Sequence, residues 1–377
     1  MIQYHYVIFN VIRLIVSIIF ILFLDGCASI GPKTIPHDRQ NYNDSVLSTE
    51  NKQILLNLVR IHYLEPPLFI KIGSITASYA WNSNLGVNPT YSKTTNNLKY
   101  WSITKAFSLN YDAGYTDTPT ISYVPLTDRE FTNAILAPIN LKQASLLISN
   151  NSKEFMRLSK LLIQSVGNIS NAAAATSADV EWVPDYSNFY RLMESLNQLS
   201  RKNGYDLLAD NQHNQFKLII RLHREFINSP EARKFKRIMN VPLDSRDIIL
   251  TQDIHSVGEN EVRTTTRSIL GVMTFLSHAV VSPPEDIRRG YLHQTYYDNG
   301  TLFNWSNLMK GIMRINYSNT HPGDAYVSVR SHGHWFYIDN KDLSSKITFT
   351  ILAELIQLSS GHDAEAISEP ILTIPVK

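Results

Sequence analysis

The sequence has few of the features that mark enzymes or disulfide-stabilised secreted proteins. It contains one cysteine, Cys27, so this chain cannot form an internal disulfide. Its formal net charge is +2, which gives no electrostatic reason to expect nucleic acid as a partner. It has no G-x-S-x-G elbow, H-E-x-x-H pair, Walker lysine loop or Rossmann fingerprint. Catalytic residues are therefore unassigned, no cofactor is expected, and whether the protein is an enzyme is left open.

Long hydrophobic runs are also missing. The apolar run Leu14–Leu24 is interrupted only by Ser17 and is shorter than the roughly 20 residues that a membrane-spanning helix needs. Arg13 and the amino terminus place positive charge before it, as in a secretory signal peptide. We therefore predict a cleaved signal peptide over residues 1–26. The alternative is an inner-membrane anchor over residues 7–24, which would bring Arg13 into hydrocarbon.

Cys27 ends a short run that resembles the lipobox of bacterial lipoproteins, Leu24-Asp25-Gly26-Cys27. Leu24 and Gly26 fit that pattern, whereas Asp25 departs from it. The resemblance implies cleavage after Gly26, a diacylglyceryl thioether on Cys27 and acylation, for example by palmitate, of the new N-terminus. Two or more acyl chains make a stable membrane anchor. Ala28 follows, and the sorting rule that comes with the resemblance then implies the outer membrane, with the protein facing the periplasm.

The rest of the chain is expected to have an α+β fold, in which helical segments pack with short antiparallel sheets and hairpins. We expect an acylated cysteine and polar tether over residues 27–48, because Asn, Asp and Pro are frequent there. An N-terminal α+β region should cover residues 49–166 and a C-terminal α+β region residues 185–377. The alanine-rich stretch 168–178 is the expected boundary between them.

Periodicity and capping signals give the expected elements. Apolar residues at helical spacing predict helices, which cover residues 49–63, 127–136, 141–149, 152–166, 185–203, 262–281 and 345–358, with a short one beginning at Ser229. Aromatic and β-branched patterns predict strands over 68–72, 216–222 and 99–124, the last with a turn at Asp112-Ala113-Gly114. Hairpin turns are also expected at Asp298-Asn299-Gly300 and at His332-Gly333-His334.

Two clusters have both a structural and a functional interpretation. Six aromatic residues are interpreted as rings of a packed sheet, or alternatively as an open groove for a small molecule or glycan: Tyr100, Trp101, Phe107, Tyr111, Tyr115 and Tyr123. Four cations near residue 235 are interpreted as a solvated helix face, or alternatively as a site for lipid phosphates or an acidic partner: Arg233, Lys234, Lys236 and Arg237.

The sharpest chemical hypothesis concerns His332 and His334. Residues two apart in a strand lie on the same face, so the two imidazoles can hold one metal ion. Zinc needs at least one further ligand, for which His293, His362 and Asp363 are candidates. The alternative is a pair of surface histidines at a turn.

A hydrolase hypothesis would use the run Ser359-Ser360-Gly361-His362-Asp363. This run contains the residue types of a catalytic triad. Neighbours in sequence are not a triad, however, because nucleophile and base must face each other in the fold. The run by itself therefore assigns no catalytic residue.

Several segments together resemble a family of uncharacterised proteobacterial outer-membrane lipoproteins. They are Arg267–Met273, Ala325–Val327, Trp335–Asp339, Asp342–Lys346 and Thr348-Phe349, together with Asn51–Tyr63, Pro66-Pro67 and Phe69. The resemblance covers most of the mature chain and implies a lipoprotein, but it brings no known activity. The sequence departs from the family pattern at His332 and His334.

These observations predict a lipid-anchored periplasmic interaction or scaffolding protein of the bacterial cell envelope. Its expected partners are membrane lipid, through acylated Cys27, and an envelope protein. One alternative is a periplasmic hydrolase or metal-dependent enzyme that uses the C-terminal histidines. Another is a small-molecule or glycan binding module.

Overall fold

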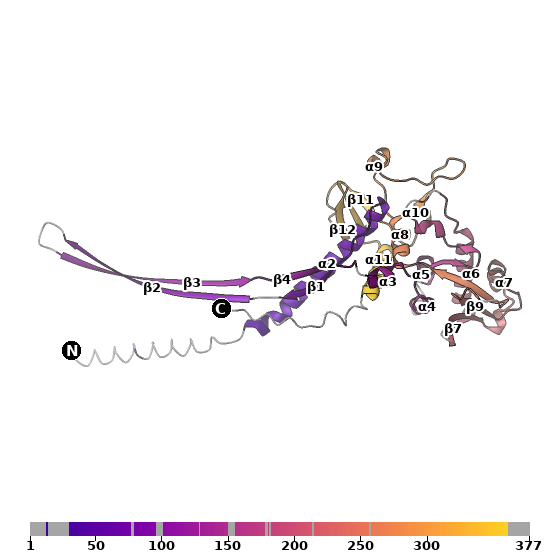
Figure 1. Ribbon diagram of the computed structural model, residues 1–377, viewed down its shortest axis with the longest axis horizontal. Helices are drawn as coiled ribbons and strands as arrows, with labels where there is room; N and C mark the ends of the chain where they lie inside the picture. Colours follow the sequence, from indigo (N-terminus) through magenta and orange to yellow (C-terminus); the bar gives the residue numbers. More distant parts are fainter. Residues whose placement is uncertain are drawn as a thin grey trace. The chain divides into compact units, whose positions relative to one another are not determined.

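The computed structural model describes residues 13, 30–76, 79–95, 101–127, 129–149, 155–177, 180, 182–212, 215–255 and 258–360. Cys27 and the predicted signal peptide, apart from Arg13, lie outside these residues. The chain divides into two compact units, one of residues 1–47 and 72–123 and the other of residues 48–71 and 124–377. The expected boundary at 168–178 therefore does not separate the units. Helices and small antiparallel or mixed sheets are both present, which confirms the α+β class (Figure 1).

Helix α2 covers Ile30–His62. The predicted polar tether over residues 27–48 is helical from Ile30 onwards. Polar residues such as Gln, Asn and Asp differ from good helix formers by less than about 1 kcal/mol each, so polar composition alone did not exclude a helix. The predicted helix over 49–63 is confirmed by buried Leu55 and Leu58 and by an end at His62.

Two side-chain amides of α2 hold the segment that follows it. Buried Asn57 donates from Nδ2 to the carbonyl of Leu68 at 2.8 Å and accepts from the Leu68 amide at 3.0 Å. Gln53 makes the same pair of bonds with Ile70, at 2.9 and 2.7 Å. These amides satisfy backbone groups as a neighbouring strand would. Strand β1 (Ile70–Thr76) begins here and pairs with β4 (Thr120–Pro125).

A long β-hairpin is the main element of the first unit. Strands β2 (Tyr79–Thr95) and β3 (Trp101–Asp117) have 17 residues each and lie side by side in an unbroken antiparallel register (Figure 1). The turn predicted at Asp112-Ala113-Gly114 was wrong, because these residues lie inside β3 and pair with Asn84, Ser83 and Asn82. Exposed Asp112 and Gly114 are compatible with a strand that has one solvated face.

The second unit contains a mixed six-stranded sheet with the order β6-β5-β10-β9-β8-β7. Strands β9 and β10 are parallel, and the other neighbours are antiparallel. The strands are β5 Ile163–Val166, β6 Ile169–Ser170, β7 Tyr205–Gln212, β8 Gln215–Leu222, β9 Asp247–Thr251 and β10 Glu261–Thr266. Buried Leu218, Ile220 and Leu222 confirm the alternation that predicted β8.

The second unit also contains helices and 3-10 turns. They are α3 Arg129–Leu136, α4 Leu141–Ser149, α5 Phe155–Leu162, η2 Ala173–Thr176, α6 Ser187–Arg201, η3 Arg224–Phe226, α7 Pro230–Met239, α8 Ile269–Ser277, α9 Pro284–Arg288, α10 Trp305–Leu308 and α11 Leu343–Ser360. Helix α8 contacts α3, α5, α11 and η2, and its Val272, Met273 and Phe275 are fully buried. This helix therefore lies in the core of the second unit.

Three boundaries differ from the prediction. The helix expected over 262–281 is only α8, because residues 261–266 form β10 and Ser268 caps the helix by accepting from the Gly271 amide at 3.0 Å. The helix expected over 152–166 ends at Leu162, where β5 begins. The alanine-rich stretch is not a linker, because Ala172 and Ala175 are fully buried. Small side chains permit this close packing as readily as they permit a flexible segment.

The end of α5 is held by a buried cation. Arg267 donates from Nη1 to the carbonyls of Lys160 (2.8 Å), Leu161 (3.1 Å) and Ile163 (2.8 Å), and from Nη2 to the carbonyl of Asn171. The last carbonyls of a helix have no partner within the helix, so a buried donor with this fork geometry stabilises them. Burial lowers the pKa of the Arg267 guanidinium to about 9.

One member of the predicted basic cluster is also buried. Lys236 in α7 donates from Nζ to the carbonyls of Ile227 (2.9 Å), Ser245 (3.2 Å) and Leu243. Its burial lowers the pKa of the amine. The other three cations of the cluster are exposed. The interpretation as a solvated face therefore holds for residues 233, 234 and 237 and was wrong for Lys236.

A three-stranded antiparallel sheet completes the fold, in the order β11-β13-β12. Its strands are β11 Asn316–Ser318, β12 Ala325–Ser331 and β13 His334–Asp339. The predicted tight turn is confirmed, with φ of 50° at His332 and 83° at Gly333, as a two-residue hairpin turn of positive φ requires. The turn at 298–300 is confirmed as well, since Tyr296 bridges Leu302 across it.

Candidate functional site

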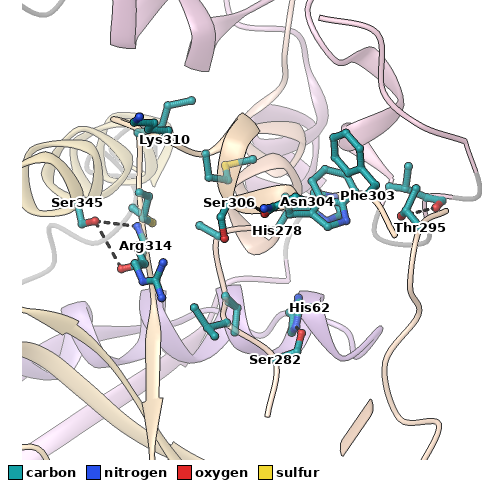
Figure 2. Close-up of a pocket in the computed structure, with 18 of the residues that line it drawn as sticks. His62, His278, Ser282, Thr295, Phe303, Asn304, Ser306, Lys310, Arg314 and Ser345 are labelled. Carbon is teal, nitrogen blue, oxygen red and sulfur yellow. Dashed lines mark hydrogen bonds between the residues drawn. The ribbon is translucent and has the colours of Figure 1, made fainter. Parts of the chain in front are cut away.

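A cavity of about 780 Å³ lies in the second unit. It is lined by His62 from α2, by the segment that follows α8, by α10 with its neighbouring loops, and by the start of α11 (Figure 2). Its volume is in the range of about 300–1,000 Å³ that small-molecule sites occupy. The cavity is therefore a candidate binding site, and its chemistry follows from its walls.

One wall is aromatic. His278, just after α8, stacks on Trp305 with ring centroids 3.9 Å apart and planes 8° apart. Phe303 meets Trp305 edge-on at 4.9 Å. Burial lowers the pKa of His278 to about 4, and its Nε2 lies 3.2 Å from the carbonyl of Ser177. His278 is therefore neutral at pH 7 and acts as a flat ring surface beside Trp305.

A histidine and a serine meet at another wall. Nε2 of His62 lies 2.9 Å from Oγ of Ser282, and Figure 2 shows the two side chains facing each other. This distance is within the reach of a nucleophile and its base. Burial, together with the nearby His278, lowers the pKa of His62 to about 3. A general base works best with a pKa near the operating pH, so His62 is a poor base at neutral pH. The pair is better suited to hydrogen-bond a ligand.

The opposite side of the cavity carries two cations. Figure 2 places Lys310 and Arg314 on one side and Phe303 and Thr295 on the other. Both cations are exposed, and the backbone amide of Arg314 donates to Oγ of Ser345 at 2.8 Å. An anionic group near Lys310 and Arg314 would therefore be attracted while a planar group contacts the aromatic wall.

The two histidines of the metal hypothesis have other partners. His332 stacks on Tyr63 with centroids 3.8 Å apart, and its Nε2 lies 3.0 Å from Oε1 of Glu65. Nδ1 of His334 lies 2.9 Å from Oδ1 of Asn319. The two rings therefore contact different side chains and do not share one metal position.

Buried Asp286 links the two sides of this cluster. Its Oδ2 accepts from the Tyr63 hydroxyl at 2.6 Å and lies 3.7 Å from Nε2 of His334. Burial and the bond to Asp286 raise the pKa of Tyr63. The end of α2 is therefore joined through Tyr63 to α9 and to the β12–β13 hairpin.

The strand geometry assumed for His332 and His334 was wrong. His332 occupies the turn, with positive φ, and only His334 belongs to β13. Among the described residues, no group of three or more His, Cys, Asp or Glu side chains is placed to hold a metal ion. His293 lines the cavity instead. His362 and Asp363 lie outside the described residues.

The hydrolase run is only partly described. Ser359 lies in α11 and donates its hydroxyl to the carbonyl of Ile356 at 2.7 Å, while residues 361–363 lie outside the described part. Sequence reasoning missed the pairs His62–Ser282 and Tyr63–Asp286. Each joins residues more than 200 positions apart (220 and 223), so no local pattern could reveal them.

The β2–β3 hairpin is a second candidate site, for macromolecules. In the described part of the chain its strands pair only with each other, so each has an edge with no neighbouring strand. Of the six aromatic residues of the groove hypothesis, Tyr100 lies outside the described residues and Tyr123 of β4 is 64% exposed. An edge with no partner is a template for pairing with another strand.

Among the described residues, no helix is long and apolar enough to cross a membrane. Comparisons with protein-family models, with curated proteins and with solved structures found no match to this chain.

Proposed function

We propose that this protein is a lipid-anchored interaction protein of the bacterial cell envelope, held at the outer membrane by acylated Cys27, facing the periplasm, and acting through the β2–β3 hairpin. The hairpin is the observation that carries this proposal. It has 17 registered residue pairs and forms a two-stranded sheet of its own. The lipobox resemblance at Cys27 supports the anchor.

The hairpin is a sheet of its own in the first unit. In the described part of the chain, β2 and β3 pair only with each other. An isolated two-stranded hairpin is marginally stable in water. A hairpin of this length that pairs with no further strand among the described residues therefore supports a role in binding a partner.

Crosslinking in cells followed by mass spectrometry tests the proposal. Wild type is compared with Cys27→Ser and with a variant in which residues 79–117 are replaced by a short turn. We expect wild type to capture an envelope partner and the hairpin deletion to lose it. The melting temperature of the second unit should be the same in both proteins. Recovery of the same partners after deletion, or of none by wild type, would contradict the proposal.

A second candidate function is small-molecule binding in the cavity. The stacked His278 and Trp305 rings opposite Lys310 and Arg314 favour a planar organic anion, such as an aromatic carboxylate. Titration of tryptophan fluorescence with benzoate and larger aromatic carboxylates tests this. Binding should be weakened at least tenfold by Arg314→Ala and unchanged by Arg330→Ala, since Arg330 does not line the cavity. Equal affinities in the two variants would count against it.

A further inference from the structure

The hairpin has a polar set of residue pairs. In its register, even-numbered residues of β2 pair with even-numbered residues of β3, so they share one face. Where the structure describes the exposure of this set, Asn88, Ser108, Asn110, Asp112, Gly114 and Thr116 are exposed and Gly86 is half-buried. In sequence the set is polar or small throughout: Ala80, Asn82, Asn84, Gly86, Asn88, Thr90, Ser92 and Thr94 on β2, and Ser102, Thr104, Ala106, Ser108, Asn110, Asp112, Gly114 and Thr116 on β3.

The odd-numbered pairs form the other face, and their sequence is mainly apolar. The register joins Trp81 with Tyr115, Leu85 with Tyr111, Val87 with Leu109, and Pro89 with Phe107, and the small pair Ser83–Ala113 lies between the first two. Strict alternation between apolar and polar positions is typical of a strand with one face in a core or in lipid and the other in water. A continuous apolar face of this length needs a core or lipid against it.

The length of the apolar segment matches a bilayer. It extends from the pair Trp81–Tyr115 to the pair Tyr91–Lys105, which is about 33 Å at about 3.3 Å per residue. A strand that crosses the hydrocarbon of a bilayer needs about 9–11 residues when tilted by about 45°. Aromatic residues at both ends of the segment, and a lysine at the end near the tip, are the residue types that anchor at membrane interfaces.

The backbone groups along the two outer edges of the hairpin need hydrogen-bonding partners. In the described part of the chain, β2 and β3 have no other neighbouring strand. Backbone amides and carbonyls cannot remain unpaired in hydrocarbon, so a single hairpin cannot stay there alone. Copies of the same chain supply matching edges, and pairing of copies around a symmetry axis turns all polar faces to the same side, away from lipid.

We propose that hairpins from several copies of this chain pair edge to edge and place their apolar face in the hydrocarbon of a lipid bilayer. The inference rests on the proposed function and names its partners: other copies at the edges and acyl chains at the odd-numbered face. The even-numbered face lines a polar interior between the copies.

An environment-sensitive fluorophore tests the lipid contact. Single cysteines at positions 87, 88, 108 and 109 of the full mature chain, in a Cys27→Ser background, are labelled with a nitrobenzoxadiazole dye and mixed with phosphatidylcholine vesicles. We expect emission to rise several-fold at positions 87 and 109 and to stay unchanged at 88 and 108, one residue away in each strand. Equal responses at all four positions, or no response at any, would overturn the inference.

Photo-crosslinking tests the contact between copies and separates the two proposals. A benzoylphenylalanine residue is placed at position 86 or 110 of the full chain in cells. Adducts of twice the chain mass support the inference. Adducts only with a different envelope protein overturn it and leave the proposed function intact, whereas the absence of any adduct counts against both.

A matched pair of charge variants gives a further check. V87D/L109D adds two carboxylates to the apolar set, and N88D/S108D adds two to the polar set at the neighbouring pair. The first should lose vesicle binding at least tenfold and the second should keep it, with the same melting temperature for both. Equal loss in the two variants would overturn the assignment of faces.

Discussion

Tyr63 donates its phenolic hydrogen to Oδ2 of Asp286 over 2.6 Å, and both side chains are buried. The contact joins the residue that follows α2 to α9, although 223 positions separate the two. His332 covers the other side of the Tyr63 ring in a parallel stack. The cluster therefore joins the end of α2 to the C-terminal part of the second unit.

Removal of that hydroxyl should destabilise the second unit. Tyr63→Phe leaves the buried carboxylate of Asp286 without its donor, so we expect the free energy of unfolding to fall by about 1–3 kcal/mol. Urea denaturation measures the change. Tyr123→Phe is the control, because Tyr123 is 64% exposed and its change should stay within about 0.5 kcal/mol. Similar losses in both variants would contradict the role given to Asp286.

Acid should unfold the protein partly through His62 and His278. Their folded-state pKa values, about 3 and about 4, lie below the ordinary value of 6.5. The unfolded chain therefore binds more protons as the pH falls below about 6.5, and stability decreases by up to about 1.4 kcal/mol per pH unit for each histidine. Full stability from these groups is present above pH 6.5.

Variants separate this contribution from that of carboxylates. The double variant His62→Gln/His278→Gln should lose less stability than wild type between pH 7 and pH 4.5, each measured by urea denaturation against its own value at pH 7. Exposed His255→Gln should keep the wild-type slope. An unchanged slope in the double variant would show that both rings protonate freely in the folded protein.

Arg267 should be among the most sensitive positions in the second unit. Arg267→Met removes a donor from four carbonyls, of which those of Lys160 and Ile163 still accept from Asn171 Nδ2, so we expect a loss of at least about 3 kcal/mol. Arg267→Lys should recover only part of it, because an ammonium group lacks the planar fork of a guanidinium. Thermal unfolding measures both. Exposed Arg330→Met is the control, and an equal loss there would argue against the carbonyl contacts as the cause.

The turn between β12 and β13 should tolerate glycine far better than alanine. Gly333 has φ of 83°, whereas Gly323 has no positive φ, and a Cβ added at either position would meet no atom within 4 Å. Gly333→Ala should therefore lower the free energy of unfolding by about 1–2 kcal/mol and Gly323→Ala should not. Chemical denaturation compares them directly, and equal stabilities would mean that the turn relaxes at no cost.

Cys27→Ser should block lipidation. The serine hydroxyl cannot form the thioether, so the variant should accumulate as an uncleaved precursor. Metabolic labelling with palmitate, followed by electrophoresis of the precipitated protein, measures both effects. Normal labelling of Cys27→Ser would contradict the lipobox assignment, and no labelling of wild type would favour the alternative anchor over residues 7–24.

Local patterns predicted local structure. The spacing of Phe189, Leu192 and Leu196 gave α6, and the proline after Ser229 gave the start of α7, because caps and apolar stripes act within a few residues. Val262 was misplaced in a helix, since a short apolar stretch fits a buried strand equally well and the six-stranded sheet decides between them.

The candidate site was much harder to predict than the elements. His332 and His334 were noticed because they are close in sequence, but the structure gives them partners just after α2, on α9 and in a loop. For the hairpin, strands were predicted in the right region but the turn was placed at the wrong residues. A turn signal at Gly114 outweighed the alternation that continues through it, although alternation over 17 residues is the stronger constraint on register.

The hydrogen bonds from Arg267 to the end of α5 also limit how early the second unit can fold during biosynthesis. The ribosome makes Lys160 107 residues before it makes Arg267, so the bonds from the guanidinium to the terminal carbonyls of α5 form only after the later residue has emerged. Such distant contacts make folding slow, because the chain must close a long loop before they form. A nascent chain that ends before α8 therefore has no completed core in its second unit. This unit stays incompletely folded until most of the protein has been synthesised.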